Sequence, residues 1–429
     1  MAIGEEKLSR RFVSFDEARA TILARAQALV MPTENVPIDD ALGRTLREDV
    51  IAQEPFPRFA NSAMDGYAVR ASEVLKATSS NPISLDVVET VAAGSIARAN
   101  IARGQTIRIM TGAPLPEGAD AVVPVEQTEA AERIEGDGTI IRVHILAPVS
   151  PGEHVRMVGE DFTAGTRLAT AGRVVDPSLI SVLATLGHTE AEVSMPPRVA
   201  IISTGDELVA PGEPVGPGQI RDSNTHTIRA MVRAAGCEPA PGWRVLDDPE
   251  ALAAAIARVA DHCEVIVTLG GVSAGDYEPV KQAMATMADG ELWRVGMRPG
   301  QPQAFGTVHG KLFFGLPGNP VSSAVVFEML VRPALWTLLG RATLDRPVVR
   351  AVLADSVESK VGRRDFLRVT LEALSAEETS RVGAAYRARL TGTQSSGAVS
   401  SILRAEGLAV VPEAKDQHLA DESIDVLSW

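Results

Sequence analysis

The sequence has few of the residues that build disulfide frameworks or zinc sites. Only two of its 429 residues are cysteine, Cys237 and Cys263, and two cysteines cannot make a disulfide framework. The seven histidines form no close pair, and no spacing of histidine and cysteine resembles a zinc site. This composition fits a reducing compartment.

Targeting segments and common catalytic signatures are also missing. The first residues lack the apolar stretch of a secretory signal. The most apolar later segment, 321–339, contains Glu328 and Arg332, so we expect a buried helix rather than a membrane span. The patterns G-x-S-x-G, H-E-x-x-H, Walker A and G-x-G-x-x-G do not occur at the places their chemistry requires. We therefore expect a cytoplasmic protein that is neither a serine hydrolase nor a metalloprotease.

Aromatic residues and positive charge are scarce as well. Aromatics make up 4% of the chain against 45% hydrophobic residues, so Val, Leu, Ile and Ala must build the cores. The formal charge is 41 − 55 = −14, which argues against nucleic acid or an anionic membrane as a partner. An anionic substrate stays possible, because a local cationic groove can oppose the global charge. The length suggests about three domains.

The pattern of residue types changes along the chain. Ser14, with Glu17 three residues later, predicts a capping box at the start of a helix that Pro32 ends. From 48 to 150, short runs such as 107–110, 121–125 and 139–146 alternate with Gly/Pro turns and predict a β-rich domain. Residues 151–190 carry a Gly-rich connection and then a helix.

Strands and helices alternate between residues 196 and 340, which predicts a parallel sheet with helical crossovers. Ligands of such sheets bind beyond the carboxyl ends of the strands. After residue 345 the pattern of residue types is again typical of β-strands. Within 366–371, Leu367, Val369 and Leu371 alternate with Phe366, Arg368 and Thr370, which predicts a half-buried strand.

Three glycine-containing loops follow predicted strands of this α/β segment, namely 205–208, 270–276 and 317–320. Glycines let backbone N–H groups converge on an anion, and Ser273 adds a hydroxyl donor. Asn319 can cap the following helix, and Pro320 suits its first position, which leaves N–H groups facing a ligand. A tight turn explains any one loop; three loops at one sheet edge favour a phosphate or oxyanion cradle.

Charged residues recur in and near these loops. The acidic residues are Asp206, Glu207, Asp247, Asp248 and Asp276. A helix cap accounts for Asp248 and solvated turns could account for Asp206 and Glu207, yet Mg²⁺ bridging carboxylates to phosphate is a reason to place acids there. The basic residues are Lys281, Arg294 and Arg298, and arginine suits bidentate contact with an oxyanion. Two clusters of the β-rich domain, 61–67 and 110–114, look locally like ordinary turns.

Six segments occur together and in order: NSAMDGYAV, RIMTGAPLPEGADAVVPVE, STGDEL, GGVSAGDYEPVK, RPGQPQAFG and GLPGNPVSS. With them the chain resembles the molybdopterin molybdenumtransferases (MoeA and gephyrin E-domain family) over nearly its whole length. The resemblance implies a multidomain α/β plus β fold. Its parts would be an elongated linking domain (1–47 and 151–190), a β-rich domain (48–150), a doubly wound, parallel-sheet molybdopterin-binding domain (191–342) and a C-terminal β domain (343–429).

The resemblance also implies a reaction and partners. Adenylylated molybdopterin and molybdate would yield molybdenum cofactor and AMP with the help of Mg²⁺. The family forms an elongated homodimer whose active groove lies between the α/β domain of one subunit and the β-rich domain of the other. Transient contact with molybdopterin adenylyltransferase or with molybdoenzymes is expected.

Motif positions transfer residue roles to this chain. The implied catalytic residues are Asp65, Glu207, Asp247 and Asp276. The implied metal-associated residues are Asp161, Glu207, Asp247 and Asp276. The implied substrate-binding residues are Thr111, Gly270, Gly271, Ser273, Gly275, Arg294, Arg298, Pro317, Gly318, Asn319, Pro320, Arg364 and Ser396.

One departure from the family pattern stands out. The family commonly has Pro-Gly-Lys-Pro, and this chain has Gln301 in place of the lysine, which removes a positive charge but keeps an amide donor. Two alternatives stay open: a molybdopterin adenylyltransferase, which would make the adenylylated intermediate, and a non-catalytic carrier or scaffold. The choice between molybdate and tungstate, the carboxylate that holds the cation, and the recipient enzyme also stay open.

Overall fold

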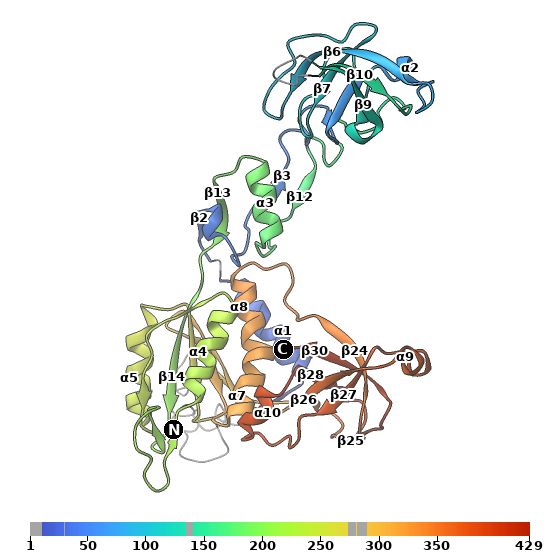
Figure 1. Ribbon diagram of the computed structural model, residues 1–429. Coiled ribbons are helices and arrows are strands. Elements are labelled where there is room, and N and C mark those ends of the chain that lie inside the picture. Colours follow the sequence, from blue (N-terminus) through green and yellow to red (C-terminus); the bar gives the residue numbers. More distant parts are fainter. Residues whose placement is uncertain (1–10, 30, 134–139, 273–279, 281–289) are drawn as a thin grey trace. The chain divides into compact units, whose positions relative to one another are not determined.

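The computed structural model describes residues 11–29, 31–133, 140–272, 280 and 290–429. The chain divides into two compact units (Figure 1). Unit 1 comprises Met1–Glu48, Ala171–Ile180 and Thr189–Trp429, and unit 2 comprises Asp49–Thr170 and Ser181–His188. The helix α3 (Pro177–Thr185) contributes residues to both units.

An eight-stranded sheet forms the centre of unit 1. Its order is β1 (Arg11–Val13), β20 (Glu291–Val295), β22 (Pro302–Val308), β23 (Lys311–Leu316), β19 (Val265–Leu269), β14 (Arg198–Thr204) and β17 (Glu238–Pro239), with β18 (Arg244–Val245) also paired to β14. The pairs are parallel except those of β22, which runs antiparallel to both neighbours. The predicted α/β fold is confirmed, with one antiparallel strand inserted in the sheet.

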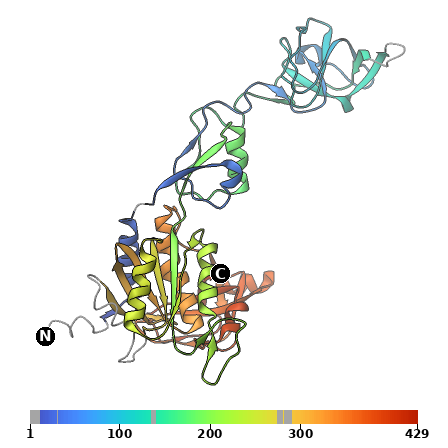
Figure 2. The ribbon, with the colours of Figure 1, turned by 90° about the vertical axis from the view of Figure 1, so that its left-hand side faces the viewer.

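Helices cover both faces of this sheet. Because the side chains of a strand alternate between the two faces, neighbouring residues of β14 belong to different cores. Val199 and Ile201 of β14 belong to the core that contains α4 (Asn224–Ala234). Ala200 and Ile202 belong to a second core with α5 (Pro249–Ala260). The two helices lie on opposite sides of β14 in Figure 1, and Figure 2 gives a second view of the layers.

The N-terminal segment packs on the α/β domain, which corrects the prediction that residues 1–47 form a linking domain. Strand β1 extends the sheet, and the apolar face of α1 (Phe15–Gln27) lies in the main core. Ser14 caps the helix by accepting the N–H of Glu17 at 3.1 Å. The Glu17 carboxylate pairs with Arg11. Helical periodicity identifies a buried face, but it does not say which surface covers that face.

A long apolar helix packs in the main core of unit 1. It consists of three continuous pieces: α7 (Pro320–Val326), the π-helical turn η4 (Phe327–Val331) and α8 (Arg332–Leu338). By length and composition Pro320–Leu338 could cross a membrane, yet 89% of its apolar window is buried inside the protein. The segment is therefore a core helix, as predicted.

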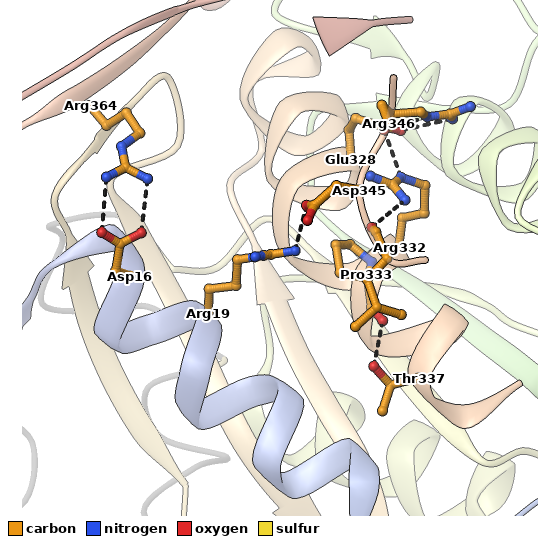
Figure 3. Close-up of polar contacts among 10 residues, drawn as sticks. Asp16, Arg19, Glu328, Arg332, Pro333, Thr337, Asp345, Arg346 and Arg364 are labelled. Carbon is orange, nitrogen blue, oxygen red and sulfur yellow. Dashed lines mark hydrogen bonds and ion pairs between the residues drawn. The ribbon is translucent and has the colours of Figure 1, made fainter. Parts of the chain in front are cut away.

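Charged side chains are buried along this helix (Figure 3). Glu328 is 4% exposed and accepts hydrogen bonds from Arg332 Nε at 2.6 Å and Arg346 Nε at 2.8 Å. The guanidinium of Arg332 also lies 4.0 Å from the ring centroid of Trp336. One carboxylate thus pairs with two guanidinium groups, of which that of Arg332 is almost fully buried, and this makes Glu328 costly to remove.

The C-terminal strands of unit 1 close into a small barrel. The order is β26 (Arg364–Ala373), β27 (Tyr386–Leu390), β24 (Val348–Leu353), β30 (Ser423–Ser428) and β28 (Gly407–Val411), and β28 pairs again with β26. Strand β21 (Met297–Arg298) pairs with β26 in parallel.

Strand β26 is buried on both faces, so the predicted half-buried alternation is wrong there. Leu367 and Val369 lie in the barrel core. Phe366 lies on the opposite face, where its ring centroid is 5.2 Å from that of Phe15. The physical reason is that α1 and the long helix cover the outer face of the barrel, and the alternation in the sequence carries no sign of that cover.

Unit 2 is built around a six-stranded sheet. Its order is β8 (Ala121–Pro124), β5 (Gly66–Val69), β7 (Gln105–Ile109), β6 (Ile83–Val91), β10 (Ile140–Ile145) and β9 (Thr128–Arg133). Separate two-stranded sheets belong to the same unit, among them β4 (Asn61–Ser62) with β11 (Val155–Arg156) and β3 (Val50–Ile51) with β12 (Arg167–Ala169). In unit 1, β2 (Thr33–Pro37) pairs with β13 (Glu190–Ser194). The domain boundaries beyond residues 11–27 stay predictions.

The substitution Glu328→Gln should destabilise unit 1 by about 3 kcal/mol, because it leaves buried guanidinium charge without a counter-ion. All four tryptophans of the chain belong to unit 1, so the tryptophan fluorescence of a urea titration reports its unfolding. The matched control is Asp425→Asn, since Asp425 pairs with Arg350 at the exposed surface of the barrel. That exposed pair should contribute less than about 1 kcal/mol. Equal effects of the two substitutions would contradict the prediction.

Candidate active site

A pocket of about 480 Å³ lies at the carboxyl ends of β14, β19 and β23. Its lining comes from the loops that follow these strands and from the start of α4. The predicted site residues that line it are Glu207, Asp247, Gly270, Gly271, Pro317, Gly318, Asn319 and Pro320. The three loops therefore meet in one place, at the sheet edge where ligands of such folds bind.

Two of the glycines have a positive φ that a side chain would strain, and one of them, Gly270, also lies against backbone. Gly270 has φ 93°, and a Cβ atom there would lie 2.9 Å from the carbonyl oxygen of Thr204. Gly205 has φ 150°, and a Cβ atom there would lie 2.5 Å from Oε2 of Glu207. The absence of side chains brings the loop after β19 against the end of β14 and leaves room for the Glu207 carboxylate.

The start of the long helix differs from the prediction. Asn319 is the N-cap residue, but its side chain makes no capping hydrogen bond. Its carbonyl oxygen accepts the N–H of Ser323 at 3.0 Å, and the N–H of Val321 donates to the carbonyl of Ser396 at 3.0 Å. The predicted Asn319 side-chain cap is therefore wrong, and the Val321 N–H is already used. Ser396 contributes its backbone to the helix end, because its loop packs against α7.

The acidic residues of the loops fall into two groups. Glu207 and Asp247 line the pocket and make no ion pair within the described part of the chain. Asp206 accepts the N–H of Asp247 at 3.1 Å, and Asp248 accepts the N–H of Glu250 at 2.9 Å, so both have structural partners. No group of three His, Cys, Asp or Glu side chains suited to a metal occurs among the described residues.

Several predicted residues lie outside the part of the chain that the structure describes. These are Ser273, Gly275 and Asp276, together with Lys281. Their predicted roles stay predictions.

The pocket also contains residues that the sequence analysis missed. Asp222 accepts Ser203 Oγ at 2.9 Å, Thr225 Oγ1 at 2.7 Å and the N–H of Thr225 at 3.0 Å. Asn224 Nδ2 donates to the carbonyl of Gly318 at 2.6 Å and so ties α4 to the loop after β23. An Asp-Ser-Asn run before a helix was the available signal, because it is typical of a helix start.

Two further lining groups could face a ligand. The buried hydroxyl of Thr204 has no hydrogen-bond partner among the described residues. Arg221 contributes a guanidinium group, which donates to the carbonyl of Glu213 at 3.3 Å. The pocket thus offers a hydroxyl, a cation and carboxylates around backbone N–H groups, a set suited to a phosphorylated ligand.

None of the three predicted arginines, Arg294, Arg298 and Arg364, is among the described residues that line this pocket. Arg294 is exposed on β20, where it lies 5.7 Å from the ring centroid of Phe12, and is not among the lining residues. Arg364 makes paired hydrogen bonds to Asp16 at 2.8 and 2.9 Å (Figure 3). It also makes paired hydrogen bonds to Glu413 at 2.8 and 2.9 Å. Two carboxylates neutralise Arg364, so the structure supports a role in tying α1 to the barrel.

Arg298 and Arg368 form a different kind of centre. Arg298 pairs with Asp365 at 2.8 Å. Arg368 is 1% exposed and donates to the carbonyl of Ser395 at 3.2 Å, to Ser401 Oγ at 3.2 Å and, more weakly, to the carbonyl of Thr393 at 3.4 Å. Burial and, to a lesser degree, the charge of Arg298 lower the pKa of Arg368 to about 10.

Arg368 makes no ion pair with any acidic residue in the described ranges. A buried guanidinium without a counter-ion is unfavourable unless an anion joins it, so Arg368 is a candidate anion ligand. The sequence analysis missed it, because the alternation in β26 predicted that this side chain faces solvent.

Unit 2 holds its own polar group. One carboxylate oxygen of Asp65 accepts both the N–H and the hydroxyl of Thr111 at 2.7 Å. The backbone hydrogen bond of Thr111, and next its side-chain hydrogen bond, lower the pKa of Asp65. Asp161 lines a separate cavity of about 620 Å³ in the same unit, together with Phe56 and Arg156.

Comparison with known protein families identifies the class of the central domain. Residues 200–337 match the family described as a probable molybdopterin binding domain. Residues 13–187 match the MoeA N-terminal region (domain I and II), and residues 350–429 match the MoeA C-terminal region (domain IV). The three matches follow one another along the chain, which is therefore built around a molybdopterin-binding domain.

Relatives extend over most of the chain. Molybdopterin molybdenumtransferase 2 of Mycobacterium tuberculosis is 43% identical over 343 residues, which cover 79% of this chain and 83% of that protein. Molybdopterin molybdenumtransferase of a Nostoc species is 36% identical over 386 residues, covering 89% and 85%. The crystal structure of the molybdopterin biosynthesis moeA protein from Pyrococcus horikoshii aligns with a TM-score of 0.79 at 28% identity, covering 98% of this chain and 100% of that one. The chain belongs to the molybdopterin molybdenumtransferase family.

The substitution Thr111→Val should raise the pKa of Asp65 part of the way to its ordinary value. It removes the hydroxyl donor and keeps the backbone donor, which is the larger cause of the low pKa. A carbon-13 NMR titration of the Asp65 carboxyl measures the change. Thr128→Val is the control, because the Thr128 hydroxyl donates to the Val125 carbonyl elsewhere in unit 2. An unchanged Asp65 titration in Thr111→Val would show that the hydroxyl does not stabilise the ionised carboxylate.

Proposed function

We propose that this protein inserts molybdate into adenylylated molybdopterin, which forms molybdenum cofactor and releases AMP. The observation that carries the proposal is the convergence in one pocket of three glycine-containing loops and two carboxylates, Glu207 and Asp247, that have no ion pair among the described residues. Membership in the molybdopterin molybdenumtransferase family supports the same reaction.

The pocket suits a phosphoanhydride. Backbone N–H groups of the loops, the Thr204 hydroxyl and Arg221 can bind phosphate oxygens. Attack of water on the adenylyl phosphorus breaks the anhydride bond, which releases AMP and leaves the other phosphate on the pterin. The two dithiolene thiol groups bind molybdenum, and their protons leave with one molybdate oxygen as water. The residues of this chain hold the anhydride in place and stabilise the charge that develops on its oxygens.

Glu207 and Asp247 fit a Mg²⁺ ion. Both carboxylates line the pocket without a basic partner in the described segments, and Mg²⁺ takes one or two carboxylates together with substrate phosphate oxygens. When bound, the ion would neutralise phosphate charge as a Lewis acid. Asp276 is proposed as a further acidic group of this set.

The arginine centre suits the tetrahedral oxyanion. Arg298, Arg363 and Arg368 carry three positive charges, and Asp365, which pairs with the first two, carries one negative charge, so the net charge is +2. Pro302, four residues after Arg298, lines the pocket, and Ser396 contacts the helix that begins there. We therefore assign molybdate binding to Arg298 and Arg368.

Further parts of the proposal concern context. A homodimer, a cytoplasmic location and transient contact with molybdopterin adenylyltransferase or with molybdoenzymes fit a protein that receives one unstable cofactor form and passes on another. Asp65, Thr111 and Asp161 are proposed as substrate-binding or metal-associated residues from unit 2.

The decisive experiment is molybdate-dependent release of AMP from adenylylated molybdopterin, coupled to reconstitution of a cofactor-free molybdoenzyme. Glu207→Ala should lower the rate at least about 100-fold with an unchanged circular dichroism spectrum, because it removes a charge that acts on the reacting phosphate. The control is Glu372→Ala, since Glu372 pairs with Arg389 at the surface of the barrel. ATP consumption in the presence of molybdopterin would indicate an adenylyltransferase instead. Cofactor binding without AMP release would indicate a carrier.

Removal of divalent cations tests the metal assignment. A chelator should abolish AMP release, and added Mg²⁺ should restore it. Asp247→Asn should raise the Mg²⁺ concentration for half-maximal rate by about tenfold, because one anionic ligand is lost. Undiminished AMP release by the chelated protein would reject the assignment of Glu207 and Asp247 to a cation.

A further inference from the structure

Asp365 is a fully buried carboxylate that the reaction described above does not use. It lies at the start of β26 and accepts hydrogen bonds from Arg363 Nε at 2.7 Å and Arg363 Nη2 at 3.0 Å. Ser359 Oγ donates to it at 3.0 Å, and Arg298 Nη2 lies 2.8 Å from its Oδ2. A single carboxylate of the barrel thus pairs with two arginines of the arginine centre, and one of them, Arg298, is assigned to molybdate binding.

Backbone register brings Arg298 to this carboxylate. Strand β21 pairs in parallel with β26, and Arg298 is aligned with Asp365 in that pairing. The side chain of Arg298 is 41% exposed, so without an anchor it would sample many rotamers. The remaining contact of its Nη2, with the Glu358 carbonyl at 3.5 Å, is too long to fix it.

The pairing leaves part of the guanidinium available. Both polar contacts that Arg298 makes with the described residues use Nη2. The Nε and Nη1 groups have no hydrogen-bond partner among the described residues, so their N–H donors are available to a ligand, in a plane that the buried carboxylate fixes. This arrangement suits an oxyanion, which takes paired N–H donors from arginine.

We propose that Asp365 is a positioning residue for oxyanion recognition: it orients Arg298 so that the free N–H groups meet molybdate. This inference rests on the proposed function, because molybdate is the oxyanion of that reaction. Asp365 itself does not touch the substrate.

In Asp365→Asn, the loss of charge and the loss of positioning should change molybdate affinity in opposite directions. The loss of one negative charge raises the net charge of the centre, and charge alone would strengthen the binding of an anion. Loss of the Asp365 carboxylate leaves the Arg298 side chain free to move. Each binding event must then order this side chain, and that entropic cost weakens molybdate binding. The direction of the change in molybdate affinity therefore separates the two effects.

The test compares Asp365→Asn with the charge-balanced double variant Asp365→Asn/Arg363→Gln. In the double variant a buried opposite-charge pair is replaced by neutral groups, so folding is expected to survive. Both variants should raise the KM for molybdate, and its dissociation constant in calorimetry, by about tenfold, the size expected for one charge-assisted hydrogen bond. The KM for adenylylated molybdopterin should stay within about twofold, since the pterin pocket is unchanged. Asp425→Asn is the matched control in the same barrel, and it should leave all three values unchanged.

A double-mutant cycle completes the test. In an Arg298→Gln background, Asp365→Asn should have no further effect on molybdate affinity, because the residue acts through Arg298. Wild-type or tighter molybdate binding in a folded Asp365 variant would overturn the inference, and so would failure of both variants to fold, which would assign Asp365 to stability alone. Wild-type protein that releases no AMP with molybdate would instead reject the proposed function.

Discussion

The site depends on a constraint of parallel sheets: the carboxyl ends of neighbouring strands lie at one edge, so the loops that follow must share the space beyond it. That space is crowded. The loop after β19 passes so close to β14 that a Cβ atom at Gly270 would meet the Thr204 carbonyl. Gly205 has no side chain that would compete with the Glu207 carboxylate for the remaining volume. The chemistry of the pocket therefore follows from the geometry of the backbone.

The C-terminal barrel completes this edge instead of standing apart from it. A carbonyl of its loop, that of Ser396, accepts the Val321 N–H at the start of the long helix. The barrel strand β26 supplies both Asp365 and Arg368 next to β21. Glu328, in the π-helical turn, ties the middle of the same helix to Arg346. Core packing and the orientation of the polar groups are thus set by the same few elements.

The sequence predicted the fold class and the meeting of the loops, because both follow from periodicity and from the rule on strand ends. It failed where a residue's role depends on which surface covers it. Phe366 and Arg368 are buried because the two faces of β26 are covered, and α1 joins the α/β core because a sheet edge is available. The side chain of Asn319 does not cap, since the Ser396 loop satisfies the next amide. Such partners come from distant segments, which local patterns do not reveal.

The acidic character of the whole chain does not decide what the site binds. Its formal charge is −14, yet the arginine centre keeps a net positive charge after Asp365 is counted. Gln301 removes one charge relative to the common family pattern, while its carbonyl accepts the Val295 N–H at 2.8 Å and keeps the loop in place. Because Arg368 is buried and is not neutralised by any described carboxylate, its field acts in a low-dielectric region and is screened less than that of an exposed lysine.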